Sequence, residues 1–277
     1  GVQTCALPIY AGAQLLARGR LHPGERSIRQ AMHGLARRRD WSGATEGAVH
    51  LARFLLHRGR LAAADEVLQA AGQWTRHARD LAPLQQQVAI LKGRVQTEGG
   101  RLHDAEAVLE SALASTVSAG SHLSLAATLA LARCLWWQGR YTDAWQRLAL
   151  VDSDRAAPAE RIRLWIGRSR ASIGLGRVTD AVAEAARARE EADAVDEPWA
   201  RGEARYASAL ALLAAGDWRQ ADALLARALT DACAAHDGLL AMCARLLRAE
   251  TARRQGRQHP AAALVRRLSR VDRTALP

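Results

Sequence analysis

The sequence is poor in aromatic residues and has almost no lysine. Aromatic residues make up 4% of its 277 positions, with a single Phe, and alanine supplies much of the 49% that is apolar. Alanine has the highest intrinsic helix propensity, and its small side chain allows helices to approach closely. This composition therefore favours closely packed helices over a β-sheet.

Arginine carries almost all of the positive charge. Lys92 is the only lysine among 39 basic residues, and the formal net charge is +11. A charge of this size often indicates a nucleic acid or an acidic partner. A chain rich in Ala, Gly and Arg is also what a GC-rich coding sequence produces, so we interpret most of the arginines as solvated surface cations.

Signals for disulfides, metals and membranes are weak or missing. The four cysteines form no CxxC pair, so we expect no disulfide framework but buried free thiols in a reducing compartment. The only candidate metal ligands are Cys233, His236 and Cys243. They form one incomplete half of a zinc site, so no metal site is predicted. No apolar run approaches the roughly 18 residues that cross a membrane, and no signal peptide is recognised. We expect a cytoplasmic protein that does not contact a membrane.

Motifs for catalysis are also missing. The sequence has no GxxxxGK phosphate loop, no HExxH, no GxSxG and no GxGxxG. Its densest carboxylate cluster lies at the end of a predicted second helix and is interpreted as a solvated acidic corner; it consists of Glu190, Glu191 and Asp193. We therefore predict neither an enzyme nor a cofactor site.

What the sequence does contain is a repeated turn. Leu135–Ala144 joins an apolar helix end to an acidic helix start through Gly139-Arg140, and comparable turns recur along the chain. Successive turn glycines are 40, 41, 39, 37, 40 and 40 residues apart. A fixed period of this size is typical of a solenoid of helical hairpins. The turn glycines are Gly19, Gly59, Gly100, Gly139, Gly176, Gly216 and Gly256.

Positions counted from each turn glycine show the pattern of side-chain size. Seven residues before it the residue is always small, five after it the residue is again small, and nine after it the residue is apolar. Small residues on facing sides allow the two helices of a hairpin to approach, and the apolar position fills the gap to the next hairpin. The predicted helix pairs are 10–18 with 22–38, 43–57 with 61–77, 81–97 with 102–118, 121–137 with 141–151, 158–173 with 178–194, 198–214 with 218–235, and 239–254 with 259–271.

These positions, together with alanine twelve residues after the glycine, resemble the tetratricopeptide repeat (TPR). The alanines are Ala31, Ala71, Ala112, Ala188 and Ala228. The period is about 40 rather than 34 residues, and the usual proline after the second helix is mostly missing. Arrays of this longer type resemble those of large bacterial transcription activators, such as the maltose-regulator type. The resemblance implies an all-α, right-handed α-solenoid of about seven TPR-like hairpins.

One polar position indicates a binding site. Six residues before the turn glycine, four successive repeats carry arginine: Arg53, Arg94, Arg133 and Arg170. In the family that the sequence resembles, first helices line a concave groove that binds peptides, so these guanidinium groups are expected to pair with carboxylates there. Trp136 and Trp137 follow Arg133 by about one turn, and they either form the floor of the groove or belong to the core.

We therefore expect a non-catalytic scaffold for protein–protein interaction or ligand sensing, binding an acidic peptide or protein partner. The resemblance suggests the sensor or regulatory arm of a larger bacterial signalling or transcription-regulator protein. The alternative is a nucleic-acid-binding α-solenoid. It is disfavoured because arginines also occur on second helices, as at Arg26, Arg37, Arg187 and Arg266, rather than along one face.

The ends of the chain look different from the array. Residues 1–9 resemble translated sequencing-adaptor text and are expected to be a non-native leader. The solenoid is assigned to 10–271 and a short tail to 272–277. We expect the chain to be a fragment of a longer protein, and no linker within it separates two domains.

Overall fold

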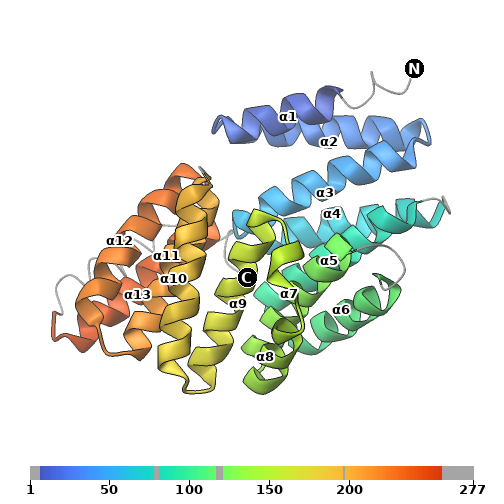
Figure 1. Ribbon diagram of the computed structural model, residues 1–277. Coiled ribbons are helices and arrows are strands. Elements are labelled where there is room, and N and C mark those ends of the chain that lie inside the picture. The colour runs from blue at the N-terminus through green and yellow to red at the C-terminus, as the bar shows by residue number, and fades with distance from the viewer. Residues whose placement is uncertain (1–6, 78–80, 117–120, 196, 258–277) are drawn as a thin grey trace. The chain divides into compact units, whose positions relative to one another are not determined.

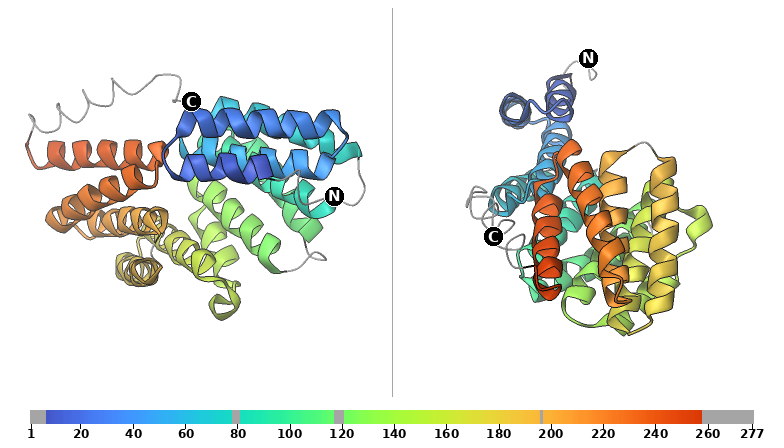
Figure 2. Two further views of the ribbon diagram at one scale, coloured as in Figure 1. Left: turned by 90° about the horizontal axis from the view of Figure 1, so that it is seen from above. Right: turned by 90° about the vertical axis from the view of Figure 1, so that its left-hand side faces the viewer.

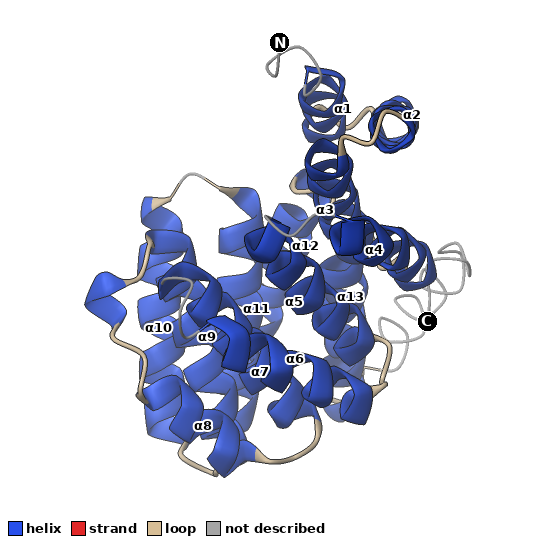
Figure 3. Ribbon diagram, turned by 90° about the vertical axis from the view of Figure 1, so that its right-hand side faces the viewer, coloured by secondary structure: helices blue, strands red, loops and turns tan. Residues whose placement is uncertain are grey.

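The computed structural model describes residues 7–77, 81–116, 121–195 and 197–257. Within these ranges the chain forms helices joined by short turns, with no strand (Figure 3). The second helix expected at 259–271, the tail and residues 1–6 lie outside the described ranges.

The chain divides into two compact units, and the boundary falls between Ala127 and Thr128, inside helix α7 (Ser121–Trp137) (Figure 1). We describe each unit by itself. The first unit contains α1 (Leu7–Ala17), α2 (Leu21–Arg37), α3 (Trp41–His57), α4 (Leu61–Trp74), the 3-10 helix η1 (Thr75–His77), α5 (Ala82–Glu98) and α6 (Leu102–Thr116). The second contains α8 (Tyr141–Ala149), the 3-10 helix η3 (Ser153–Arg155), α9 (Pro158–Gly174), α10 (Val178–Ala194), α11 (Pro198–Ala214), α12 (Trp218–Ala234) and α13 (Gly238–Arg254).

Within each unit the helices pack in chain order as antiparallel hairpins. In the first unit α1 packs on α2, α3 on α4 and α5 on α6, and in the second α9 packs on α10 and α11 on α12. Second helices also contact the first helix of the next hairpin within a unit, as α2 does with α3 and α10 with α11 (Figure 2). The expected all-α, TPR-like solenoid is confirmed.

The repeated glycine ends the first helix of each hairpin. All seven turn glycines have φ between +72° and +82°, a conformation that side chains with a Cβ rarely adopt. At Gly59, the glycine N–H donates to the carbonyl of Leu56, and the following N–H of Arg60 donates to Leu55, each at 2.9 Å. This is the Schellman arrangement, which satisfies carbonyls at the end of a helix.

The small positions bring the backbones of a hairpin together, as the sequence predicts. Ser169 lies seven residues before its turn glycine, and its hydroxyl donates to the carbonyl of Ala181, five residues after that glycine, at 2.8 Å. A Cβ added to Gly24 would lie 2.8 Å from the carbonyl oxygen of Gly12. Side chains larger than these cannot occupy the two positions without moving the helices apart.

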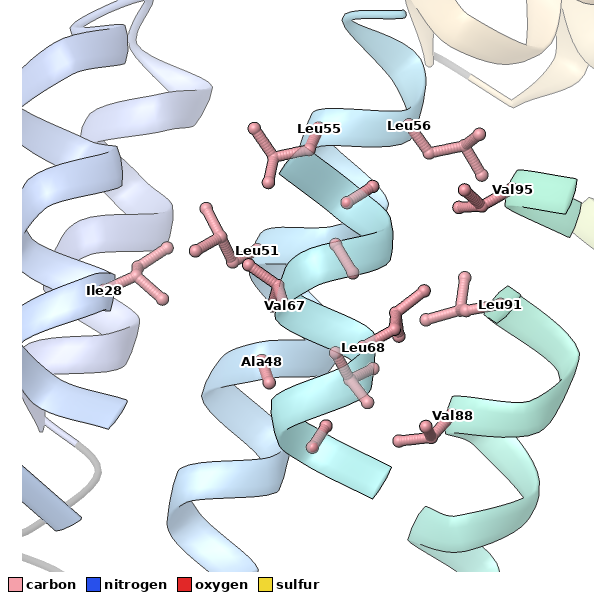
Figure 4. Packing of buried hydrophobic residues seen from close by; sticks show 14 of the residues in the cluster. Ile28, Ala48, Leu51, Leu55, Leu56, Val67, Leu68, Val88, Leu91 and Val95 are labelled. Atoms are coloured by element: carbon pink, nitrogen blue, oxygen red, sulfur yellow. The ribbon is translucent and has the colours of Figure 1, made fainter. Parts of the chain in front are cut away.

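The core of the first unit consists mainly of large aliphatic side chains. Leu51 and Leu55 of α3 are fully buried, as are Ile28 of α2 and Leu68 of α4. Val88, Leu91 and Val95 of α5 pack into the same cluster (Figure 4), which also includes Leu16 of α1 and so joins five consecutive helices.

Several details differ from the sequence-based expectations. Helix α8 ends at Ala149 rather than near 151, and Arg168 of α9 donates to the carbonyls of Leu148 and Val151 at its end. Helix α1 begins at Leu7, and Ile9, within the segment set aside as a leader, is buried.

The thiols also differ from one another. Cys134 is buried, as expected, but Cys233 is exposed. The expectation of a buried thiol was wrong for Cys233, because its position on α12 faces away from the hairpin interior, where Ala228 and Ala232 are buried.

Candidate interaction surface

The structure places the four predicted arginines on four successive first helices. Arg53 lies on α3, Arg94 on α5, Arg133 on α7 and Arg170 on α9. Arg53 is exposed, and the other three are half-buried. The first two belong to one unit and the last two to the other, so they form two pairs, each on first helices that are neighbours within a unit.

In the first unit, α3 and α5 contact each other directly. Arg53 belongs to an exposed stripe on α3 that also contains Glu46 and His50. The ring of Tyr10 from α1 meets His50 edge-on at 6.5 Å, and Tyr10 is 56% exposed. Partial burial lowers the pKa of His50, and the positive charge of Arg53 lowers it further, which places the two side chains in one electrostatic environment.

In the second unit, a tryptophan links the helices that carry the arginine pair. The indole N–H of Trp136 on α7 donates to the backbone carbonyl of Arg170 on α9 at 2.9 Å. Arg133 lies three residues before Trp136 on the same helix. The hydrogen bond therefore fixes the backbone at Arg170 against the helix that carries Arg133.

The two adjacent tryptophans have different environments. Trp136 is half-buried and hydrogen-bonded to α9, whereas Trp137 is 50% exposed. Their rings meet edge to face with centroids 4.9 Å apart. Trp136 therefore links two first helices and Trp137 faces solvent, and a place on the floor of a binding groove stays a prediction for both.

Neighbouring aromatic residues pack between successive hairpins. The ring of Tyr141 on α8 lies directly on the Cα of Gly174 on α9, so that a Cβ there would overlap the ring. The guanidinium of Arg177 lies 5.1 Å from the ring centre of Trp145. These contacts confirm packing between hairpins for Tyr141 and Trp145.

Sequence reasoning missed a contact that recurs between hairpins. The arginine directly after a turn glycine reaches back to a carboxylate six residues after the preceding turn glycine. The pairs are Arg60 with Glu25 at 2.6 Å, Arg101 with Asp65 at 3.0 Å and Arg257 with Asp222 at 3.6 Å. The signal is present in the sequence as Glu or Asp six residues after one turn glycine and arginine directly after the next turn glycine. These arginines bridge hairpins and are not simply solvated surface cations.

The acidic cluster on α10 is also paired. Glu191 accepts from Arg161 at 2.8 Å and from the indole N–H of Trp165 at 2.9 Å, both on α9. Asp193 accepts from Arg205 of α11 at 3.2 Å. The interpretation as a solvated acidic corner was wrong for Glu191, because α9 beside it carries arginine and tryptophan, whereas Asp193 is exposed as expected.

One carboxyl group on the same helix is held in a less polar environment. Glu184 is half-buried, and burial raises its pKa, although the hydroxyl of Ser172 donates to it at 2.8 Å. Over the residues that the structure describes, no three His, Cys, Asp or Glu side chains come together as a metal site. Within the same ranges, no helix has the length and apolar character needed to cross a membrane.

Comparison with known proteins reveals relatives of the fold but not of the sequence. No family model and no curated protein sequence matches the chain. A Rap protein solved in complex with competence and sporulation factor superposes with a TM-score of 0.72 and 16% identity, over 97% of this chain and 74% of that one. A tetratricopeptide repeat protein from Parabacteroides merdae ATCC 43184 gives 0.58 and 14%, over 96% and 93%.

A third solved structure, BtubC (BKLC) from P. vanneervenii, gives a TM-score of 0.54 and 15% identity over 76% of this chain and 89% of that one. Sequence identities this low establish a common fold only. The superpositions, together with the repeated turn, the small facing positions and the order of the hairpins, show that this chain has a TPR-like helical repeat fold.

Proposed function

We propose that the chain is a non-catalytic recognition scaffold that binds an acidic peptide, or an acidic segment of a protein, along its first helices. It would serve as the sensor or regulatory arm of a larger bacterial signalling or transcription-regulator protein. The observation that carries this proposal is the recurrence of arginine at one repeat position on four successive first helices, where no side chain is fully buried.

The chemistry of arginine supports an acidic ligand. A guanidinium group presents a planar fork of donors that matches a carboxylate, and it keeps its charge at any physiological pH. Within each unit the repeated position places two such groups on neighbouring first helices, which suits a segment with repeated carboxylates. The Rap protein that shares this fold was solved with competence and sporulation factor bound, which supports a recognition role.

The test uses a labelled peptide rich in glutamate and a matched peptide with lysine in its place. In one variant Arg53, Arg94, Arg133 and Arg170 are changed to Glu. Binding of the acidic peptide is measured by fluorescence anisotropy, and helix content by circular dichroism. We expect the variant to stay helical and to bind about tenfold more weakly or worse, because it reverses four charges at the interface.

A control variant changes four exposed arginines on second helices, two in each unit: Arg26, Arg37, Arg219 and Arg227. It alters the net charge by the same amount and should leave binding nearly unchanged. Equal losses in both variants, or none in the first, would contradict the proposal. Binding to duplex or single-stranded DNA that weakens steeply with salt, without binding to the acidic peptide, would favour the nucleic-acid alternative.

A further inference from the structure

Cations from two separate stretches of the chain meet at one corner of the first unit. The imidazole of His33 on α2 meets the indole of Trp74 on α4 at 6.3 Å, with an interplanar angle of 89°. Trp41, at the start of α3, stacks on His77 of η1 with ring centres 4.9 Å apart and an angle of 29°. These contacts bring residues 33–41 together with residues 74–77. We call the exposed residues of the two stretches the basic corner; they are His33, Arg37, Arg38, Arg39, Arg76 and His77.

The positive charge of the basic corner is not compensated by ion pairs. Over the residues that the structure describes, none of its four arginines has a carboxylate partner. The only described carboxylate in the two stretches, Asp40, accepts from the backbone N–H of Gly43 at 3.0 Å. Arg79 and Asp80, the next charged residues along the chain, lie outside the described ranges and have opposite charges. A cluster of exposed arginines of this kind suits an anionic ligand.

The backbone at Arg39 has an unusual conformation. Its φ is +62°, and its N–H and that of Asp40 donate to the carbonyls of Ala36 and Leu35, as in the glycine turns. A residue with a Cβ is strained at positive φ, and all seven turns within hairpins have glycine there. Residues held in such conformations cluster at functional sites. The presence of arginine rather than glycine at this position therefore supports a role for its side chain.

The aromatic pairs indicate which anion fits. His77 is exposed although its ring lies against Trp41, so a further flat ring can stack on the imidazole. A single strand of nucleic acid offers both phosphates and stacking bases, whereas an acidic peptide would use only the arginines and a duplex keeps its bases inside. The sequence disfavours a nucleic-acid surface along the whole array, because arginines are spread over both helices. At this corner, cations and rings are gathered together.

We propose that the basic corner binds single-stranded nucleic acid. Its four arginines pair with phosphates, and one base stacks on His77. Trp41 is a positioning residue that acts through His77, because its indole lies against that ring. This site goes beyond the proposed function, since it takes a different ligand and uses none of the four arginines at the repeated position.

The test measures the binding of three labelled probes to the full chain by fluorescence anisotropy. The first is a thymidine strand of about ten nucleotides, a length typical of single-strand sites. The second is a strand of the same length with abasic sites, which has the phosphates but no bases, and the third is a duplex of the same length. Each titration is repeated at several salt concentrations.

We expect the thymidine strand to bind about tenfold more tightly than the abasic strand, a contribution typical of one stacked base. The duplex should bind more weakly than the thymidine strand. The logarithm of the association constant for the thymidine strand should fall against the logarithm of salt concentration with a slope of about −3, because four phosphates are contacted.

The charge variant changes Arg37, Arg38 and Arg76 to Gln. It should weaken both single-stranded probes and flatten the salt slope by about 2, because three phosphate contacts are lost. The matched control removes the same charge from three exposed arginines of the second unit and should leave affinity and slope nearly unchanged. Its positions are Arg155, Arg219 and Arg227.

Arg39→Gly separates binding from folding. It relieves the strained backbone, so the thermal unfolding midpoint should be at least as high as in the unchanged chain, while the salt slope should flatten by about 0.7. His77→Ala should remove the preference for the thymidine strand over the abasic strand, and Trp41→Leu should reduce that preference in part. A general loss of folded protein would weaken both strands equally and would not change the preference.

Several results would overturn the proposal. Equal affinities for the thymidine and abasic strands would show that no base is stacked. Tighter binding of the duplex, or equal losses in the charge variant and its control, would show attraction to the overall positive charge rather than to this corner. Absence of binding by the unchanged chain would overturn the proposal as well. Binding of the acidic peptide is measured separately, so each of these results leaves the proposed function standing.

Discussion

The two units build the same hairpins from different core residues. Between α2 and α5 the core is made of large aliphatic side chains such as Leu51, Leu55 and Leu68. Between α10 and α13 most buried positions are alanines, among them Ala204 and Ala221. Because alanine buries little apolar surface, the free energy of burial per residue is smaller in the second unit.

Polar contacts distinguish the units as well. In the second unit arginines lie over the rings of four tryptophans, Trp145, Trp165, Trp199 and Trp218. In the first unit the aromatic rings contact histidines instead, as His33 does with Trp74 at 6.3 Å. The repeat therefore requires small facing positions and a glycine turn, while the remaining stabilisation can come from aliphatic burial or from arginine contacts.

The largest effect is expected from changing the volume of either core. Leu51→Ala should lower the free energy of unfolding by about 2–5 kcal/mol, because a fully buried side chain leaves a cavity. In the alanine core the damaging change is the opposite one, and Ala204→Leu should cost about 1–3 kcal/mol by overpacking. Denaturant unfolding of each variant measures the loss in the free energy of unfolding, and hydrogen exchange shows which helices are destabilised.

Leu246→Ala is the control for these two variants, since Leu246 is half exposed and should change stability by about 0.5 kcal/mol or less. A stabilising effect of Ala204→Leu would show that the alanine core contains unfilled space. The conclusion that the second unit has a core filled by small side chains would then be wrong.

The next effect concerns the carboxylate of Asp231 on α12, which is only 8% exposed. It accepts from Arg205 at 2.6 Å and lies 3.9 Å from Arg201, both on α11. Asp231→Ala should lower stability by about 1.5–3 kcal/mol, because two arginines lose a charged partner in a partly buried site. A double-mutant cycle with Arg205→Ala should show strong coupling. If the losses of the two single variants simply add in the double variant, the ion pair does not stabilise the second unit.

Smaller losses are expected at the contacts between hairpins. Arg101→Ala in the first unit removes the bridge to Asp65, and its arginine side chain is 48% exposed. We expect a loss of about 0.2–1 kcal/mol that shrinks at high salt. Arg177→Ala in the second unit removes the contact with Trp145 and should cost about 0.5–1 kcal/mol. Thermal unfolding at low and high salt compares the two, and an Arg101→Ala loss that is independent of salt would contradict an ionic bridge.

The smallest effects are expected from protonation, and they have opposite signs in the two units. Burial lowers the pKa of His50, so the folded first unit disfavours the imidazolium, and stability should fall as the pH drops below about 6.5. Burial raises the pKa of Glu184, so the folded second unit favours the neutral acid, and stability should rise as the pH drops towards about 4.5.

His50→Gln and Glu184→Gln should each remove the corresponding pH dependence, measured as the denaturation midpoint between pH 4 and 8. If Glu184→Gln leaves the profile unchanged, or if it changes the profile in the direction assigned to His50, the environment described for that carboxyl is wrong.

Much of the architecture is predictable because its determinants are local. A glycine with positive φ ends each first helix, and the absence of larger side chains at the facing positions allows the backbones to meet. These requirements hold whatever the neighbouring hairpin contains, so the helix boundaries are predicted to within a few residues from the sequence alone. The end of α8 could not be predicted as closely from local signals, since Arg168 of the next hairpin donates to the carbonyls of Leu148 and Val151 there.

The candidate site is predictable only in part. The sequence identifies the four arginines as one repeat position, and whether they bind a ligand stays a prediction. It gives no sign that Glu191 is paired with Arg161 and Trp165, because that pairing joins residues 26 to 30 positions apart on two helices. The bridges between hairpins become visible in the sequence once the contact of Arg60 with Glu25 has been seen.

The sequence by itself therefore determined the period, the turns, the facing small residues and the helical fold. Only the tertiary structure decided which side chains face a neighbour and which face solvent. Trp136 and Trp137 show the reason, because adjacent residues on a helix point about 100° apart. One indole meets the backbone of α9 and the other faces water, a difference that depends on where the next hairpin lies.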